Sequence, residues 1–255
     1  MTKAWVLITR VVLGTLLVSS MLALPAGARS NDKAKSGTQT VDSGSFGVFI
    51  KGQRVVTETF GVQQENGAST VTSQLKENAG ANPTSQKSEL QMTSSGELIR
   101  YEWAETSPAG VSLVVVPNNE FLIEKITTSA NAKPAEQPFL MPNTSVILDN
   151  NFFVHREVLA WRYLATNCHN EGGELRCQKG PIEFGVLVPQ DRTSMRVRME
   201  LVGREKVTIR GVERELLRLN LSGEGFSWAL WVDEKDQFKL MRVVIADDNT
   251  EVVRD

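Results

Sequence analysis

The sequence Met-Arg-Val-Arg-Met-Glu-Leu-Val at residues 195–202 alternates apolar and charged side chains almost to its end. Its odd-numbered residues up to 201 are apolar, and its even-numbered residues up to 200 are charged. Successive side chains of a β-strand point to opposite faces of the sheet. The stretch therefore predicts a strand with one buried face and one face in water, which is typical of an antiparallel sheet.

Short runs with β-strand character fill most of the chain on both sides of this stretch. Turn residues separate them, and the dipeptide Asn66-Gly67 is a strong signal for a tight hairpin. Strands that follow one another so closely predict an antiparallel meander, and an open sheet with so many strands tends to curl. The expected strands cover 46–50, 54–63, 68–77, 87–93, 97–105, 111–116, 121–127, 181–188, 195–202, 205–209, 213–221, 226–232, 238–245 and 250–254.

One helix is expected, over residues 150–166, where apolar and aromatic side chains recur at helical spacing. Asp149 or Asn150 would cap its first turn, and the charged run 155–157 would face outward. In the strand expected at 228–232 both the odd-numbered and the even-numbered residues are apolar, so both of its faces should be buried. We therefore expect a mainly β fold: a large curved antiparallel sheet, an incomplete barrel of meander topology, with one principal helix packed on it.

The first residues show the three parts of a secretory signal peptide. Lys3 and Arg10 give a positive start, residues 11–24 are apolar or small, and the small residues up to Ala28 suit signal peptidase. We expect residues 1–28 to be a signal peptide cleaved after Ala28, and a periplasmic or secreted product. An uncleaved anchor is the less favoured alternative. No later apolar run approaches the length of a membrane span, so none is expected after cleavage.

Composition divides the rest of the chain. Residues 29–44 are polar and predict a disordered leader. Residues 45–255 predict a single β-rich domain, with 45–127 and 143–255 as alternative halves on either side of a proline-containing connection.

The formal net charge of −2 gives no reason to expect nucleic acid as a partner.

The chain has two cysteines, Cys168 and Cys177, which lie close together in the sequence. In an exported protein such a pair usually forms a disulfide, and Gly172-Gly173 between them indicates a turn. We expect a stapled surface loop. Metal binding with His169 lacks a fourth ligand, and a redox-active pair would prefer the Cys-x-x-Cys spacing that is missing here.

The sequence offers few groups for catalysis. The two histidines, His155 and His169, fall in the expected helix and in the cysteine loop, and the common nucleophile, zinc and phosphate motifs do not occur. Asp42-Ser43-Gly44 matches the tripeptide of aspartic proteases, but the residues before it are polar rather than an apolar strand. We expect no catalytic residue, no metal and no cofactor, and therefore a protein that is not an enzyme.

Arginine and lysine residues are frequent between 192 and 218, where acidic residues are interleaved with them. Cross-strand ion pairs on a solvated face are the favoured interpretation. A groove for anionic head groups is the alternative, because arginine binds carboxylate and phosphate well.

Four aromatic residues are candidates for the wall of a ligand cavity between the sheet and the helix. They are Phe153 and Trp161 in the expected helix and Trp228 and Trp231 in an expected strand. Large aromatic side chains can line apolar pockets. The alternative is that they are simply part of the core.

Three segments of this sequence, in this order, resemble a group of exported bacterial proteins. They read VILDNNFFVHREVLAWRYL at 146–164, FGVLVP at 184–189 and SWALWVDEKDQFKLMRVVI at 227–245. The chain looks like the uncharacterised exported proteins that resemble the periplasmic lipoprotein carriers. In those carriers a curved antiparallel sheet forms an incomplete barrel that takes acyl chains. The resemblance covers about residues 45–255 and implies a binding or scaffold protein.

The expected function is that of a periplasmic, non-enzymatic binding protein for an apolar or amphipathic ligand, such as a lipid or a lipoprotein acyl chain. A structural or protein-interaction module of the cell envelope is the alternative, because an exposed sheet edge can accept a strand from a partner. A hydrolase is the third and least favoured hypothesis. A cavity would favour the first, whereas a solid core with a long bare edge strand would favour the second.

Overall fold

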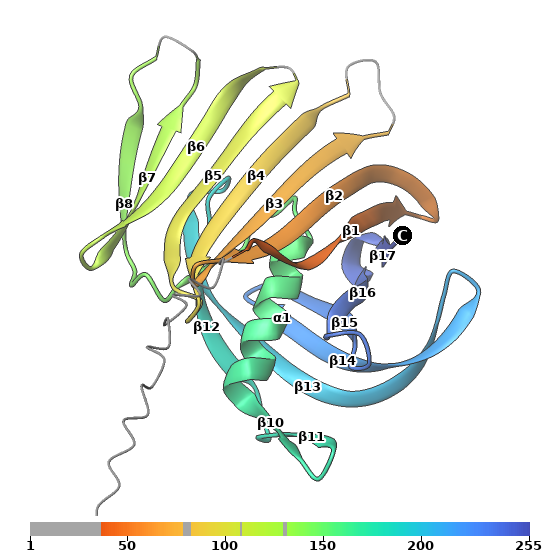
Figure 1. The fold of residues 1–255 in the computed structure, drawn as a ribbon. Coiled ribbons are helices and arrows are strands. Elements are labelled where there is room, and N and C mark those ends of the chain that lie inside the picture. The colour runs from red at the N-terminus through yellow and green to blue at the C-terminus, as the bar shows by residue number, and fades with distance from the viewer. Residues whose placement is uncertain (1–36, 79–82, 108, 130–131) are drawn as a thin grey trace, which may run out of the picture. The chain divides into compact units, whose positions relative to one another are not determined.

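The computed structural model of the protein describes residues 37–78, 83–107, 109–129 and 132–255 (Figure 1). These residues belong to one compact unit, Ser36–Asp255. The expected signal peptide, residues 1–28, lies outside the described residues, as does the expected leader up to residue 36.

The first eight strands form a meander, and tight turns join several of its neighbouring strands. Asn66 and Asn119 have φ angles of 53° and 54° in two of these turns, in the left-handed region that tight hairpins need. The strands are β1 (Gln39–Ile50), β2 (Gln53–Glu65), β3 (Ala68–Glu77), β4 (Ser85–Thr93), β5 (Leu98–Ser107), β6 (Ala109–Asn118), β7 (Phe121–Thr127) and β8 (Ala135–Leu140).

The second part of the chain contains the helix and a second meander. A short 3-10 turn at Ala246–Asp248 precedes the last strand. The elements are β9 (Val146–Ile147), α1 (Val154–Asn167), β10 (Cys168–Glu171), β11 (Glu174–Cys177), β12 (Ile182–Val188), β13 (Thr193–Ile209), β14 (Val212–Gly223), β15 (Phe226–Asp233), β16 (Lys239–Ile245) and β17 (Thr250–Arg254).

Among the described residues, a single sheet of 15 strands contains both meanders, in the order β8 to β1, then β17 to β12, then β9. Its ladders are antiparallel, except for the short parallel pairing of β9 with β12. The first strand pairs with the last over Phe46–Ile50 and Thr250–Arg254, which joins the two meanders into one sheet. Strands β8 and β9 are its two ends, so the sheet is curved but not closed. The expected fold class is confirmed.

Strand β1 begins earlier than the sequence indicated. The expected disordered leader of residues 29–44 overlaps it, because residues 39–44 pair with β2. The polarity of this segment was misleading, since Asp42 is buried in an ion pair although it is charged. The leader prediction is therefore wrong for residues 39–44.

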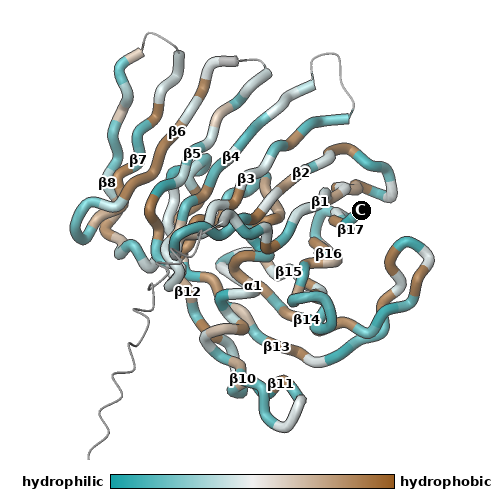
Figure 2. Tube along the Cα trace, viewed as in Figure 1, coloured by the Kyte–Doolittle hydropathy of each residue, from teal (hydrophilic) through white to brown (hydrophobic). Residues whose placement is uncertain are grey.

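Helix α1 lies in the hollow of the curved sheet (Figure 1). Apolar side chains of the helix and of both meanders form one continuous core there. Apolar and polar residues alternate along the strands in Figure 2, as expected for a sheet that buries one face. The hollow is thus the inner face of the sheet and contains most of the hydrophobic core.

A β-bulge transfers part of strand β13 to a second cluster on the other face. The pairing with β14 shifts between Leu201 and Gly203, and Gly203 has a φ angle of 153°. An extra residue reverses which side chains face inward. Val207 and Ile209 therefore leave the inner face and cluster with Trp231. The two strands expected at 195–202 and 205–209 are one continuous strand.

The start of the helix also differs from the prediction. It begins at Val154 rather than at 150, and neither Asp149 nor Asn150 is its N-cap. Residues 155–157 are fully buried rather than facing outward. The hollow of the sheet encloses this end of the helix from all sides, so no turn of its first half has a solvated face.

Candidate ligand-binding groove

A carboxylate from the sheet anchors the start of helix α1. The carboxylate of Glu58, on β2, accepts hydrogen bonds from the backbone N–H groups of Phe153 and Val154 at 2.6 and 3.2 Å. A negative charge at this position compensates the free N–H groups and the dipole of the helix. Burial raises the pKa of Glu58 to about 7, although these bonds and the hydroxyl of Ser73 oppose the shift.

Arg156 packs into the core at the same end of the helix. Its guanidinium donates to the carbonyl oxygens of Asp149 and Phe152 and lies over the rings of Trp228 and Phe153, at 4.9 and 5.1 Å from their centroids. Burial lowers its pKa to about 10, although the nearby charges of Asp149 and Glu58 oppose this shift. The cation therefore fills the space between helix and sheet where a ligand cavity was expected.

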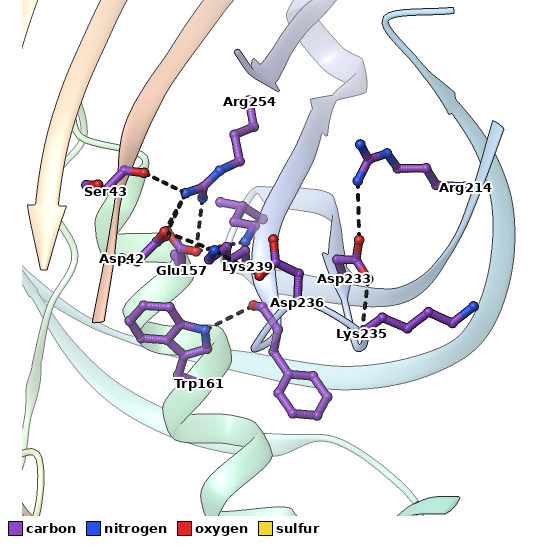
Figure 3. A network of polar contacts seen from close by, with 12 residues as sticks. Asp42, Ser43, Glu157, Trp161, Arg214, Asp233, Lys235, Asp236, Lys239 and Arg254 are labelled. Carbon is purple, nitrogen blue, oxygen red and sulfur yellow. Dashed lines mark hydrogen bonds and ion pairs between the residues drawn. The ribbon is translucent and has the colours of Figure 1, made fainter. Parts of the chain in front are cut away.

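Glu157 belongs to a second buried network, which Figure 3 shows. Arg254, on β17, donates to Asp42 at 2.6 Å and to Glu157 at 3.3 Å. The backbone N–H of Leu240 donates to the same oxygen of Glu157 at 2.9 Å. Burial and the neighbouring charge of Asp42 raise the pKa of Glu157, although Arg254 opposes the shift. Asp42 is thus an internal ion-pair partner, which argues against the protease interpretation.

Open space lies farther along the helix, on both sides of Trp161. One lobe of about 550 Å³ extends toward the turn after β4 and toward β9, and a second of about 540 Å³ extends toward the start of β1 and the β10–β11 hairpin. Trp161, Ala165 and Gln64 line both lobes. We call these two lobes together the Trp161 groove.

The indole of Trp161 is fixed in place between the two lobes. Its Nε1–H donates to the carbonyl oxygen of Phe238 at 3.0 Å, as Figure 3 shows. Val158, Trp161, Arg162 and Ala165 line the groove from the helix. They occur at i, i+3, i+4 and i+7, which places them on one flank of a helix. This spacing is the signal in the sequence that could have identified Arg162 and Ala165.

The other three expected wall residues do not line the groove. Phe153 and Trp228 pack against Arg156 on the inner face. Trp231 lies on the opposite face, between Arg218 and Arg242, and its Nε1–H donates to Glu205 at 3.0 Å. Trp228 and Trp231 are three residues apart on β15, and side chains separated by an odd number of residues point to opposite faces of a strand. The structure therefore does not assemble these four aromatic residues into one wall.

Hairpin β10–β11 forms the end wall of the second lobe. Cys168 and Cys177 are joined by a disulfide, as expected, and they are directly opposed in the hairpin. Cys168, His169 and Leu175 line the lobe. No group of residues suited to a metal ion occurs in the part of the chain that the structure describes.

The arginine-rich segment forms ion pairs on the sheet. Arg218 pairs with Glu205 at 2.8 Å and Arg204 with Glu234 at 2.8 Å. These contacts agree with cross-strand pairing on a partly solvated face. Arg204 and Arg218 are thus already engaged by carboxylates, which favours the ion-pair interpretation over a groove for head groups.

The fold places the protein among incomplete, β-barrel-like sheets with a helix in the hollow. Among solved structures, it is similar to a β-barrel-like protein of the domain of unknown function DUF1849 from Brucella abortus, with a TM-score of 0.51 and 8% sequence identity. The match covers 83% of this chain and 93% of the other. This likeness concerns the fold.

No family model and no curated protein matches the sequence. The structural likeness to the Brucella abortus protein supports the resemblance to uncharacterised bacterial proteins with this architecture. The further likeness to lipoprotein carriers stays an expectation. Helix α1 is too short and too polar to cross a membrane, and no other described helix could do so.

Proposed function

We propose that the protein is a non-enzymatic binding protein that holds an apolar or amphipathic ligand, such as a lipid or a lipoprotein acyl chain, in the Trp161 groove. The signal peptide predicted at residues 1–28 would place it in the periplasm or outside the cell. The observation that carries the proposal is the groove itself: two lobes of about 550 and 540 Å³ that share an aromatic side chain. Ligand sites typically have volumes of this size.

The position of the ligand differs from the one that the sequence suggested. Arg156, Phe153 and Trp228 fill the space between the first half of the helix and the sheet. A ligand would therefore lie along the second half of the helix. Leu90, Leu98 and Val158 give the first lobe an apolar floor, and Leu164 and Phe238 do the same for the second.

Hydrophobic burial can supply enough free energy for binding. Each methylene removed from water contributes about 0.8 kcal/mol, which corresponds to about a fourfold change in Kd. Eight methylenes would contribute about 6 kcal/mol before the entropic costs of binding. The Kd of a chain series should therefore fall with each added methylene until the groove is full.

Strand addition at the sheet edge, which the envelope-module alternative would use, has less support. The edge strand β8 has only six residues and contains Pro138, which has no N–H to donate. Short edge strands and proline are devices that prevent pairing with another chain.

The test is direct binding of a fluorescent fatty acid to the mature protein, with native mass spectrometry of the protein purified from the periplasm. Trp161→Ala should weaken binding at least tenfold, because it removes the largest apolar side chain that lines both lobes. Trp161→Phe should retain much of the affinity. Leu140→Ala, at a remote residue that is 75% exposed, is the control and should change nothing.

Two results would overturn the proposal. One is a clean apo mass together with no uptake of the added fatty acid. The other is a dimer in solution that Trp161→Ala converts to a monomer, because the groove would then be an interface between two copies of the chain.

A further inference from the structure

We propose that the Trp161 groove selects an anionic amphiphile with a single acyl chain, whose carboxylate pairs with Arg162 while its chain passes over Trp161. This inference rests on the proposed function and adds the head-group chemistry. It follows from the charges around the groove, from the geometry of Arg162 and from the distribution of apolar side chains.

The charges that line the groove are of one sign. Among the described residues of both lobes, Arg162 is the only side chain with a permanent charge, His169 is the only other titratable group, and neither aspartate nor glutamate occurs. The protein as a whole carries a formal net charge of −2. A cation beside apolar side chains, with no carboxylate among the lining residues, is complementary to an anion that carries an apolar chain.

The guanidinium of Arg162 is held in a fixed position. It donates to the carbonyl oxygens of Gly96 at 3.3 Å and Thr144 at 2.7 Å. Neutral carbonyl groups hold the guanidinium in place without neutralising its charge, and a guanidinium has five N–H donors. Donors are therefore left for a ligand, and a pre-oriented fork loses little entropy when a carboxylate binds.

The cation is also partly removed from water. Burial lowers the pKa of Arg162, and the charge of Glu97 opposes this shift only in part. A partly desolvated cation gains more from an anionic partner than an exposed one does. A bound carboxylate would therefore be favoured over a neutral head group at this position.

Apolar surface for the chain begins next to the cation. Val158 and Trp161 lie one turn before Arg162 and Ala165 on the same flank of the helix. Beyond Trp161 the second lobe continues to Leu164 and Leu175. A linear amphiphile can thus place its head at Arg162 and its chain along the groove.

The test uses three ligands with the same oleyl chain: oleate, monoolein and oleylamine. Each competes with a dansylated fatty acid for the intact mature protein. Oleate should bind at least tenfold more tightly than monoolein, and oleylamine should bind most weakly. Arg162→Gln should remove the advantage of oleate over monoolein and leave the affinity for monoolein within about twofold.

Two further variants keep the test decisive. Arg162→Lys retains the positive charge but not the planar guanidinium. Compared with Arg162→Gln, it should recover part of the preference for oleate. Arg196→Gln is the matched control, because Arg196 is exposed and remote from the groove. If Arg162→Gln fails to fold, the three ligands with the wild-type protein and with Arg162→Lys still decide the question.

The two hypotheses fail in different ways. Equal affinity for all three ligands would overturn the selection of anions and leave the proposed function standing. No binding of any of the three would overturn the proposed function itself. An unchanged oleate preference in a folded Arg162→Gln protein would show that another group recognises the head.

Discussion

At the scale of single residues, buried charge is the feature that the sequence conceals. His155, Arg156 and Glu157 were expected on a solvated face, yet each is fully buried. Helical periodicity shows which residues share a face, but it cannot show that strands surround that turn on every side. Glu157 becomes understandable only with Arg254 on β17, and Arg156 only with the ring of Trp228 on β15.

Glu124, on β7, is a buried carboxylate whose burial is opposed only by the charge of Arg192. Neither of its oxygens has a hydrogen-bond partner among the described residues, and burial raises its pKa to about 7. Because the folded protein then binds more protons than the unfolded chain between about pH 4.5 and 7, the free energy of unfolding falls as the pH rises through that window.

Replacing Glu124 by glutamine should therefore stabilise the protein at pH 8 by about 1–3 kcal/mol and flatten the pH dependence between pH 5 and 7. Urea unfolding at several pH values measures both effects. Glu102→Gln, at a residue of the neighbouring sheet surface that is half exposed, is the control and should have little effect. A destabilised Glu124→Gln protein at pH 8 would show that the ionised carboxylate has a partner.

At the scale of elements, sequence patterns predicted strands better than their junctions. Alternation identified β13 and β14, and the Cys168–Cys177 spacing predicted the disulfide correctly. The bulge at Gly203 was interpreted as a break between two strands. Apolar residues stay at odd-numbered positions on both sides of it, so the alternation could not show that the sheet face changes there. The groove was missed because its walls come from segments distant in the sequence, although the spacing of Val158, Trp161 and Ala165 was readable.

Hairpin β10–β11 should couple the disulfide to ligand affinity. Replacing Cys168 and Cys177 together by serine removes a cross-link that closes a short loop, which should cost about 2–3 kcal/mol of stability. Because this hairpin forms a wall of the second lobe, the affinity for the fatty acid should also fall. This loss should be seen at temperatures well below the midpoint of thermal unfolding, where the variant is still folded. Thermal unfolding and fluorescence titration measure the two effects. An unchanged Kd in the folded variant would mean that the hairpin does not contribute to the groove.

At the scale of the whole molecule, the pairing of β1 with β17 joins the two meanders. The sequence predicted strands, turns and curvature, since these depend on neighbouring residues. It left open whether the two halves form one sheet, because contacts between the first and last strands leave no local pattern. Arg254 reinforces this junction, because it joins β17 to Asp42 on β1 and to Glu157 on α1.

Removing this cation should destabilise the molecule strongly. Arg254→Met leaves buried Glu157 without its cationic partner and Asp42 with only Lys239, at 3.7 Å, which should lower the free energy of unfolding by about 3–5 kcal/mol. Adding Asp42→Asn and Glu157→Gln should restore more than half of the loss, because the unpaired charges are then gone. Chemical denaturation of the single and triple variants measures this difference. A triple variant no more stable than the single one would show that the network acts through packing rather than charge.

The neighbouring positions of the first and last strands also set the order in which the sheet can be completed as the chain is synthesised. Strand β1 is synthesised among the first described residues, and β17 supplies its second neighbour only when residues 250–254 follow. Until then β1 has a free edge, and a free edge can pair with other chains. The five residues that finish the sheet are therefore also the ones that end this vulnerable period.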